Sequence, residues 1–286
     1  MAAVVLASCA VGTAGSTPAG GRLKVLAAET FLADIAQNVA GDRLVVESLL
    51  PPGADPHEFQ ATPQDAVRIA QAQLLLVNGQ GYEAWLEKSL RAGAGNTRIV
   101  EASAGVDPTG GGDPHLWMDP RNVRRYAENI RQALSEADPD GRSIYEANAQ
   151  KYMAELSALD EWIRAEVEQV PPQRRKLITN HHALGSFAAA YGFEIVGVVI
   201  PGVTSEAAPS AQQVAELIRT VALLEAPAIF LDASERPNLA QQVAAESGAR
   251  VISGLYVETL SKADGPAPTY VEMMKYDTQL IVEALR

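Results

Sequence analysis

Residues 139–170 read PDGRSIYEANAQKYMAELSALDEWIRAEVEQV, and beyond Gly141 this stretch contains neither glycine nor proline. The side chains that recur at three- and four-residue intervals are Tyr145, Asn148, Tyr152, Leu156, Leu159, Ile163 and Val167. This spacing predicts one helix of about 30 residues, about 45 Å long at 1.5 Å per residue. Because a crossover inside one small sheet needs less length, we expect a strut that joins two lobes. An ordinary long core helix of a single domain is the alternative.

Short β-rich runs alternate with helical patterns on both sides of this helix. Before it, strands are expected at residues 23–27, 44–50, 74–77 and 98–100, and helices at residues 30–40, 62–72, 83–91 and 119–137. After it, strands are expected at residues 176–179, 194–200, 228–231 and 250–253, and helices at residues 184–191, 210–224, 237–247 and 269–286. Such alternation predicts mostly parallel sheets with helices on both faces.

The expected fold class is therefore α/β, with two lobes joined by one long rigid helix. Each lobe contains a mostly parallel sheet flanked by helices. The expected divisions are a signal remnant and flexible tether at residues 1–21, an N-terminal lobe at 22–138, a linking helix at 139–171 and a C-terminal lobe at 172–286. Two lobes on one strut leave a cleft, and open α/β sheets carry their ligand groups beside such clefts.

Composition and charge narrow the class of protein. Of the 286 residues, 47% are hydrophobic and 20% are charged, which allows a sizeable core and excludes a disordered chain. The formal net charge of -12 opposes a basic surface for phosphates. We therefore expect no binding to nucleic acid.

The single cysteine, Cys9, follows an apolar stretch at residues 2–7 and precedes a segment rich in glycine, serine, threonine and proline. Small residues before a cysteine and a flexible tether after it resemble a bacterial lipobox, in which the cysteine is lipidated after cleavage. An ordinary thiol is the alternative. No later segment reaches the roughly 20 continuous apolar residues of a membrane span. We expect an extracytoplasmic protein, periplasmic or at the cell surface, anchored to the membrane by a lipid at Cys9.

All four histidines lie in three short segments beside turn-forming residues or helix starts. These segments are GADPH at residues 53–57 with His57, DPHLWMDP at residues 113–120 with His115, and TNHHA at residues 179–183 with His181 and His182. A single loop histidine is more often a surface residue or a partner of a backbone carbonyl than a metal ligand. Three such segments together nevertheless predict a metal site assembled by folding, because neutral imidazole nitrogens are good zinc ligands.

Longer motifs surround these histidines. They are GADPHEF at residues 53–59 with Thr62-Pro63, DPHLWMDP at residues 113–120, and NHHALG at residues 180–185 with Phe187 and Tyr191-Gly192. In this order they resemble the motifs of the metal-binding substrate-binding proteins of bacterial ABC importers for zinc and manganese, which include lipoproteins once called adhesins. The resemblance runs from about Leu23 to the C-terminus.

The resemblance also implies which side chains hold the metal. In the family the third ligand lies two positions before the alanine, which is His181 here, whereas His182 falls where an aspartate is common and is a weaker candidate. The fourth ligand is a carboxylate in the last strand-to-helix loop, and GLYVETL at residues 254–260 places Glu258 there. Asp264 is the nearby competitor. The implied ligand set is His57, His115, His181 and Glu258.

Three imidazoles and one carboxylate favour Zn2+, because nitrogen ligands suit borderline-soft cations and Mn2+ prefers more oxygen. In the family a carboxylate at the third ligand position tends to accompany manganese, and this chain has His181 there. Many zinc importers carry a long histidine-rich loop before the second ligand, whereas this chain has only residues 107–112. We expect Zn2+ as the transported ligand, with Mn2+ or Fe2+ as the alternative.

The resemblance thus implies a protein, expected to be a monomer, that captures zinc between two lobes and delivers it to an ABC permease. The opposing class is a zinc hydrolase in which water fills the fourth metal position and Glu258 acts as general base. A catalytic site keeps an open position, whereas four protein ligands close the shell, so we expect no enzymatic activity. Adhesion to a host protein, often assigned to lipoproteins of this family, has no direct support in the residues.

Overall fold

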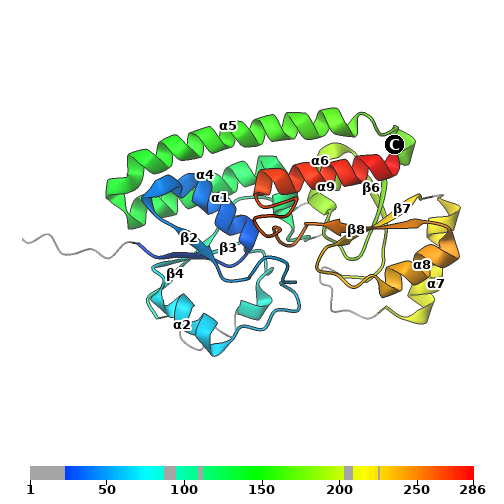
Figure 1. Ribbon diagram of the computed structural model, residues 1–286, viewed down its shortest axis with the longest axis horizontal. Helices are drawn as coiled ribbons and strands as arrows, with labels where there is room; N and C mark the ends of the chain where they lie inside the picture. Colours follow the sequence, from blue (N-terminus) through cyan, green and yellow to red (C-terminus); the bar gives the residue numbers. More distant parts are fainter. Residues whose placement is uncertain (1–22, 87–94, 109–111, 203–208, 225) are drawn as a thin grey trace, which may run out of the picture.

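The structure, a computed structural model, describes residues 23–86, 95–108, 112–202, 209–224 and 226–286. Two lobes lie side by side, and the long helix α5 (Arg142–Val167) runs along both of them (Figure 1). Cys9 and the tether expected at residues 1–21 lie outside the described residues. So does part of the helix expected at residues 83–91.

The N-terminal sheet has four parallel strands in the order β2-β1-β3-β4. Its strands are β1 (Val25–Ala27), β2 (Val46–Ser48), β3 (Leu74–Val77) and β4 (Arg98–Glu101), and its helices are α1 (Thr30–Ala40), α2 (Pro63–Gln71) and α4 (Pro120–Ala137). Successive strand residues point to opposite faces of a sheet. Val25 accordingly packs in the cluster that contains α1 and α4, whereas Leu26 packs with Ile69 of α2.

The C-terminal sheet repeats this strand order as β6-β5-β7-β8, again all parallel. Its strands are β5 (Lys176–Thr179), β6 (Glu194–Val198), β7 (Ala228–Asp232) and β8 (Arg250–Leu255), and its helices are α6 (Gly185–Tyr191), α7 (Ala211–Leu223), α8 (Asn238–Ser247) and α9 (Tyr270–Leu285). Helices α6 and α9 lie on the face towards α5, and α7 and α8 cover the other face (Figure 1). The expected α/β class with two parallel sheets is confirmed.

Local signals set the starts of two helices that follow the histidine loops. Thr62 caps α2 by accepting a hydrogen bond from the backbone nitrogen of Asp65, and Pro63 occupies the first helical position. Asp119 caps α4 in the same way, through the backbone nitrogen of Arg121, and a proline again follows. Both histidine loops therefore end in rigidly capped helices.

Helix α5 is 26 residues long, shorter than expected, because a 3-10 turn over Pro139–Gly141 precedes it and because it ends at Val167, before the expected end at residue 171. Its buried stripe packs against α1 and α4 in one lobe and against α6 and α9 in the other. One continuous hydrophobic cluster consequently includes Phe31, Tyr152 and Phe187, which come from both lobes and from the helix between them. The helix is therefore a core element as well as a connection.

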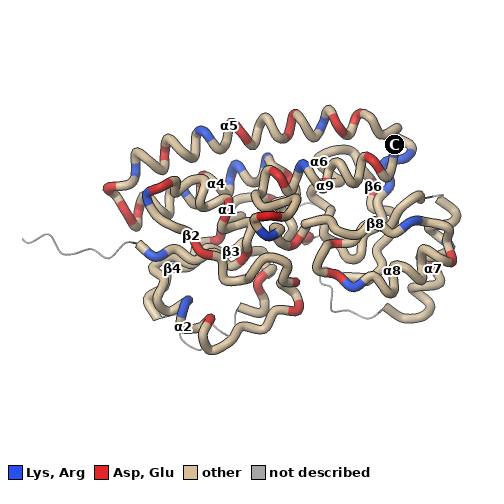
Figure 2. Tube along the Cα trace, in the orientation of Figure 1, with Lys and Arg blue, Asp and Glu red and all other residues tan. Residues whose placement is uncertain are grey.

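The outward side of α5 carries charges of both signs along its length (Figure 2). The exposed charged residues of this helix include Arg142, Glu146, Lys151 and Glu161. Charged side chains of both signs are typical of the solvent-exposed face of a helix. Among the described residues, no helix has both the length and the apolar character that crossing a bilayer would require.

Candidate metal centre

Four loops, each following a parallel strand, meet between the two sheets. His57 follows β2 and His115 follows β4 in the N-terminal half, while His181 follows β5 and Glu258 follows β8 in the C-terminal half. The carboxyl ends of parallel strands are where open α/β sheets place their ligand-binding groups. The paired sheets therefore bring together side chains that lie up to about 200 positions apart in the chain.

The four side chains form a compact cluster. Each offers one ligand atom, and these atoms all lie within 4.8 Å of one another. The three imidazoles converge on one carboxylate oxygen, Glu258 Oε1, which lies 2.9 Å from His115 Nε2, 2.9 Å from His181 Nε2 and 3.6 Å from His57 Nε2. All four side chains are at most 5% exposed, so water is largely excluded from the cluster.

Asp113 orients the His115 ring. Its Oδ1 lies 2.6 Å from His115 Nδ1 and also accepts a hydrogen bond from the His115 backbone nitrogen. Its Oδ2 accepts the backbone N–H of Gly185 at the start of α6, 3.0 Å away. A Cβ at position 185 would lie 2.3 Å from that oxygen, so the close approach of the two lobes here requires glycine.

Glu235, just after β7, orients the His181 ring in the same way. Its Oε1 lies 2.8 Å from His181 Nδ1 and accepts a hydrogen bond from Asn180 Nδ2 at 2.7 Å. A carboxylate behind a histidine fixes the ring orientation and makes the other nitrogen a better ligand. The adjacent His182 is exposed, so the structure brings only the first histidine of this pair into the cluster.

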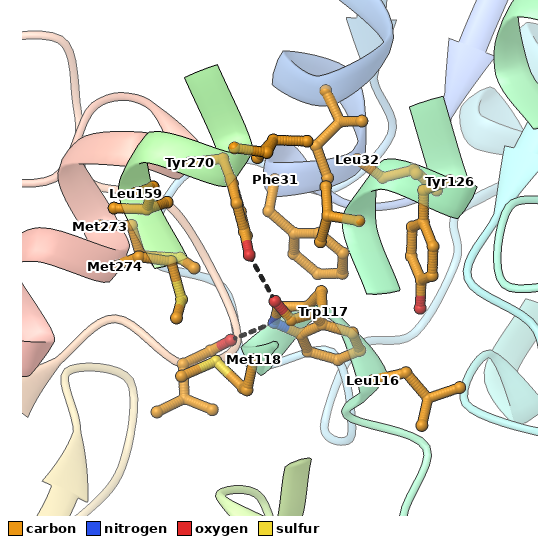
Figure 3. Close-up of a cluster of buried hydrophobic side chains, with 14 of the residues drawn as sticks. Phe31, Leu32, Leu116, Trp117, Met118, Tyr126, Leu159, Tyr270, Met273 and Met274 are labelled. Carbon is orange, nitrogen blue, oxygen red and sulfur yellow. Dashed lines mark hydrogen bonds between the residues drawn. The ribbon is translucent and has the colours of Figure 1, made fainter. Parts of the chain in front are cut away.

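Both lobes hold the loop that carries Glu258. From the C-terminal lobe, Asp232 Oδ2 accepts the backbone N–H groups of Val257 and Glu258 at 2.5 and 3.1 Å. From the N-terminal lobe, Trp117 Nε1 donates to the Val257 carbonyl at 2.9 Å. Figure 3 shows the Trp117 indole beside Phe31, on which it stacks, and the Tyr270 hydroxyl donating to the Trp117 backbone carbonyl, so both the ring and the backbone of Trp117 are fixed. Asp264, the competing carboxylate, is exposed and outside the cluster.

Tyr82 contacts the cluster from the loop after β3. Its buried hydroxyl donates a hydrogen bond to Glu258 Oε2, the oxygen that faces away from His115 and His181. Its ring packs edge-on against the His57 and His115 rings, with centroids 5.4 Å away in both cases. Each oxygen of the Glu258 carboxylate thus has its own set of partners.

Charge pairing shifts the pKa values of the cluster in opposite directions. Burial alone would raise the pKa of Glu258, but the imidazoles of His115, His181 and His57 lower it well below its usual range. Burial alone would lower the pKa of the imidazoles, but Glu258 with Asp113 raises that of His115 to about 9, and Glu235 with Glu258 raises that of His181 to about 10. In the metal-free cluster these carboxylates favour the protonated form of both imidazoles, so a cation that binds there displaces protons.

These side chains fit a divalent transition-metal cation. His57 Nε2 is buried and has no hydrogen-bond partner within the part of the chain that the structure describes, although it points at the shared Glu258 oxygen. A buried nitrogen in that state costs free energy unless something binds it. Three imidazole nitrogens and a carboxylate are donors that first-row divalent cations accept.

The sequence did not identify several residues that support the cluster, among them Asp113, Asp232, Glu235 and Tyr82. Asp232 and Glu235 end or follow β7, and their place at the carboxyl end of a strand is a signal that could have found them. Tyr82 lies in the loop after β3, so the same signal applies to it, but nothing local indicates its partner, which is 176 positions away in the chain. Only the folded chain brings the two together.

Comparisons with known proteins agree with this geometry. The family model described as "Zinc-uptake complex component A periplasmic" matches residues 25–284. The iron-binding protein YfeA of Yersinia pestis is 36% identical, covering 92% of this chain and 86% of its own length. The manganese-binding lipoprotein MntA of Halalkalibacterium halodurans is 33% identical, covering 99% and 95%.

Two further similarities concern transport and fold. The manganese ABC transporter substrate-binding lipoprotein PsaA of Streptococcus pneumoniae is 28% identical, covering 100% of this chain and 96% of its own. The solved structure of the periplasmic zinc-binding protein TroA from Treponema pallidum superposes with a TM-score of 0.86 at 27% identity, covering 93% of this chain and 99% of that one. The similarity therefore extends over both lobes.

Proposed function

Since this chain belongs to the family of the periplasmic component A of the zinc-uptake complex, we propose that it captures one divalent transition-metal cation between its lobes and delivers it to the permease of an ABC importer. The family comprises substrate-binding proteins, so the chain is not an enzyme, and its place is outside the cytoplasm. The hydrolase alternative has no remaining support.

One observation carries the proposal: the convergence of His57, His115, His181 and Glu258, whose ligand atoms lie within 4.8 Å of one another. We propose these four as the ligands of the cation. His115 and His181 each have a carboxylate behind the ring, which is the arrangement that metal-binding histidines commonly show. Four protein ligands leave no position that catalysis at the metal would need.

As cargo we propose Mn2+ or Fe2+. The support comes from the relatives: MntA and PsaA are named for manganese and YfeA for iron. The zinc preference expected from the sequence is not what these names favour.

Zn2+ is the second candidate, and the donor set is the observation that favours it. Three imidazoles with one carboxylate suit Zn2+ better than Mn2+, which prefers more oxygen ligands. The family description and the zinc-binding relative TroA point the same way.

We also propose the expected partition into an N-terminal lobe at residues 22–138, a linking helix at 139–171 and a C-terminal lobe at 172–286. Separate four-stranded sheets on either side of α5 support it.

We propose a lipid at Cys9 as the membrane anchor, because MntA and PsaA are named lipoproteins. We also propose that the protein is a monomer.

The deciding experiment is elemental analysis of the protein isolated from the extracytoplasmic side of cells grown with manganese, iron and zinc together. Affinity alone does not identify the cargo, because nitrogen and oxygen sites generally bind Zn2+ more tightly than Mn2+. We expect one bound cation per wild-type chain and almost none in His115→Ala. A wild-type protein that carries no metal and binds none after chelation would refute the proposal.

A further inference from the structure

The two carboxylate oxygens of Glu258 have different partners. Oε1 lies among the three imidazoles, 2.9 Å from His115 Nε2 and 2.9 Å from His181 Nε2. Oε2 instead accepts the hydrogen bond of the Tyr82 hydroxyl. A carboxylate can bind a cation through one oxygen or through both, so what occupies Oε2 affects the number of bonds available.

The Tyr82 hydroxyl donates this hydrogen bond to Glu258 Oε2 from a buried position, since the residue is only 4% exposed. This hydrogen bond satisfies both the hydroxyl and the carboxylate oxygen. Breaking it in a buried site costs free energy, because both groups lose a partner.

The ring that carries this hydroxyl is fixed on several sides. It packs edge-on against His57 and His115 at 5.4 Å, and against Trp117 at 4.9 Å between centroids. Trp117 in turn donates to the carbonyl of Val257, the residue before Glu258. The packing of the Tyr82 ring and the hydrogen bond from Trp117 to Val257 thus hold the hydroxyl and the Glu258 carboxylate in place relative to each other.

From this geometry we propose that Tyr82 is a specificity-determining residue, which holds Glu258 to a single metal-binding oxygen and so biases the site towards cations that accept four ligands. A cation such as Mn2+, which prefers more oxygen ligands, would gain from a second Glu258 oxygen, whereas Zn2+ is satisfied by three nitrogens and one oxygen. The inference rests on the proposed metal-binding role of Glu258, and it favours Zn2+, the second candidate, over Mn2+ as the cargo.

The test compares Tyr82→Phe with the wild-type chain for the ratio of Mn2+ to Zn2+ affinity, measured by competition with a chelator of known affinity for each ion. The phenyl ring keeps the packing and removes only the hydroxyl. We expect the ratio to shift towards Mn2+ by about tenfold, the scale on which groups behind metal ligands act. Circular dichroism melting checks that the variant is folded.

Tyr145→Phe is the matched control. Tyr145 is also fully buried, and its hydroxyl also donates to a carboxylate, Asp138 Oδ2, at 2.5 Å. It lies in the first turn of α5, and its contacts are with Asp138 and Arg43 rather than with the cluster. We expect this variant to keep the wild-type ratio.

A ratio unchanged in Tyr82→Phe, a ratio shifted towards Zn2+, or an equal loss of affinity for both ions would each overturn the inference while leaving metal capture intact. A wild-type chain that binds neither ion would instead refute the proposed function. Crystal structures of the wild-type protein loaded with Zn2+ and with Mn2+ give a second measurement that needs no variant. Glu258 bound through both oxygens, with the Tyr82 bond broken, would also overturn the inference.

Discussion

At the scale of single residues, the neighbouring His181 and His182 show how one position decides a role. His181 is 2% exposed and lies 2.9 Å from Glu258, with Glu235 behind its ring. His182 is exposed, and its backbone nitrogen donates to the Gly202 carbonyl outside the cluster. Identical side chains one position apart therefore have opposite environments.

We predict that His181→Ala lowers metal affinity by about a hundredfold or more, because it removes one donor and takes from the buried Glu235 one of its partners. His182→Ala makes the same chemical change one residue away and should alter affinity less than threefold. Isothermal titration of both metal-free variants measures the difference. If His182→Ala proved to be the damaging change, the register of the ligand set would be wrong by one residue.

At the scale of secondary structure, α1 and α9 are joined by a carboxylate that is partly buried between them. Asp34 Oδ2, on α1, accepts the backbone N–H of Tyr270 at the start of α9, 2.9 Å away. Burial raises the pKa of Asp34 to about 6, above its ordinary value of 3.8, and Glu155 and Glu272 add to the shift despite this hydrogen bond. Between pH 3.8 and about pH 6, Asp34 is therefore protonated in the folded chain but ionised in the unfolded chain.

We therefore predict that Asp34 makes the metal-free protein less stable as the pH rises from about 4 to about 6, because ionising it while buried is unfavourable. Asp34→Asn should remove this loss. Between pH 4 and pH 7, the unfolding free energy of the variant should therefore change more favourably than that of the wild type, by on the order of 1 kcal/mol after allowance for solvent screening. Urea unfolding at both pH values measures the change. Equal pH dependence in variant and wild type would contradict the prediction.

Asp138→Asn is the control with the opposite sign. The side-chain hydrogen bond with Arg43 lowers the pKa of Asp138 despite some burial, and Tyr145 adds to the shift. The stabilisation from this ion pair is present above the unfolded pKa and is lost as the pH falls through the folded one. Asp138→Asn should therefore destabilise the protein at neutral pH and have little effect in acid.

At the scale of the whole molecule, the two lobes share a hydrophobic core. The cluster that contains Phe31 and Trp117 from the first lobe also contains Phe187 and Tyr270 from the second, with the buried stripe of α5 between them. The metal cluster adds side chains from both sheets at the same boundary. Neither lobe can unfold without exposing apolar surface of the other.

We predict a single thermal unfolding transition for the metal-free protein, and one that shifts upward as a whole when metal binds. At a hundredfold excess of cation over Kd, the gain of about 2.7 kcal/mol corresponds to roughly 5 °C in Tm. Differential scanning calorimetry with and without Mn2+ or Zn2+ measures it, and His115→Ala should lose the shift. Two separate transitions, of which metal moves only one, would argue against a shared core.

Much of the architecture was predictable because its causes are local. The limits of α1, β3, α4 and β5 agree with the expected ranges, since hydrophobic period, caps and turn residues act within a few positions. The length of α5 was overestimated because Pro139–Gly141 forms a separate 3-10 turn and the helix ends at Val167. The candidate ligands could be named from motifs, although their convergence could only be expected.

What the sequence by itself determined, then, is the order and type of the elements and the donor groups placed after the strands. The tertiary structure alone decided which groups meet. The bond from Tyr82 to Glu258, the carboxylate of Glu235 behind His181 and the core shared through α5 all join distant segments. Such contacts depend on how two sheets and a helix pack, and packing is a property of the whole chain that no local pattern encodes.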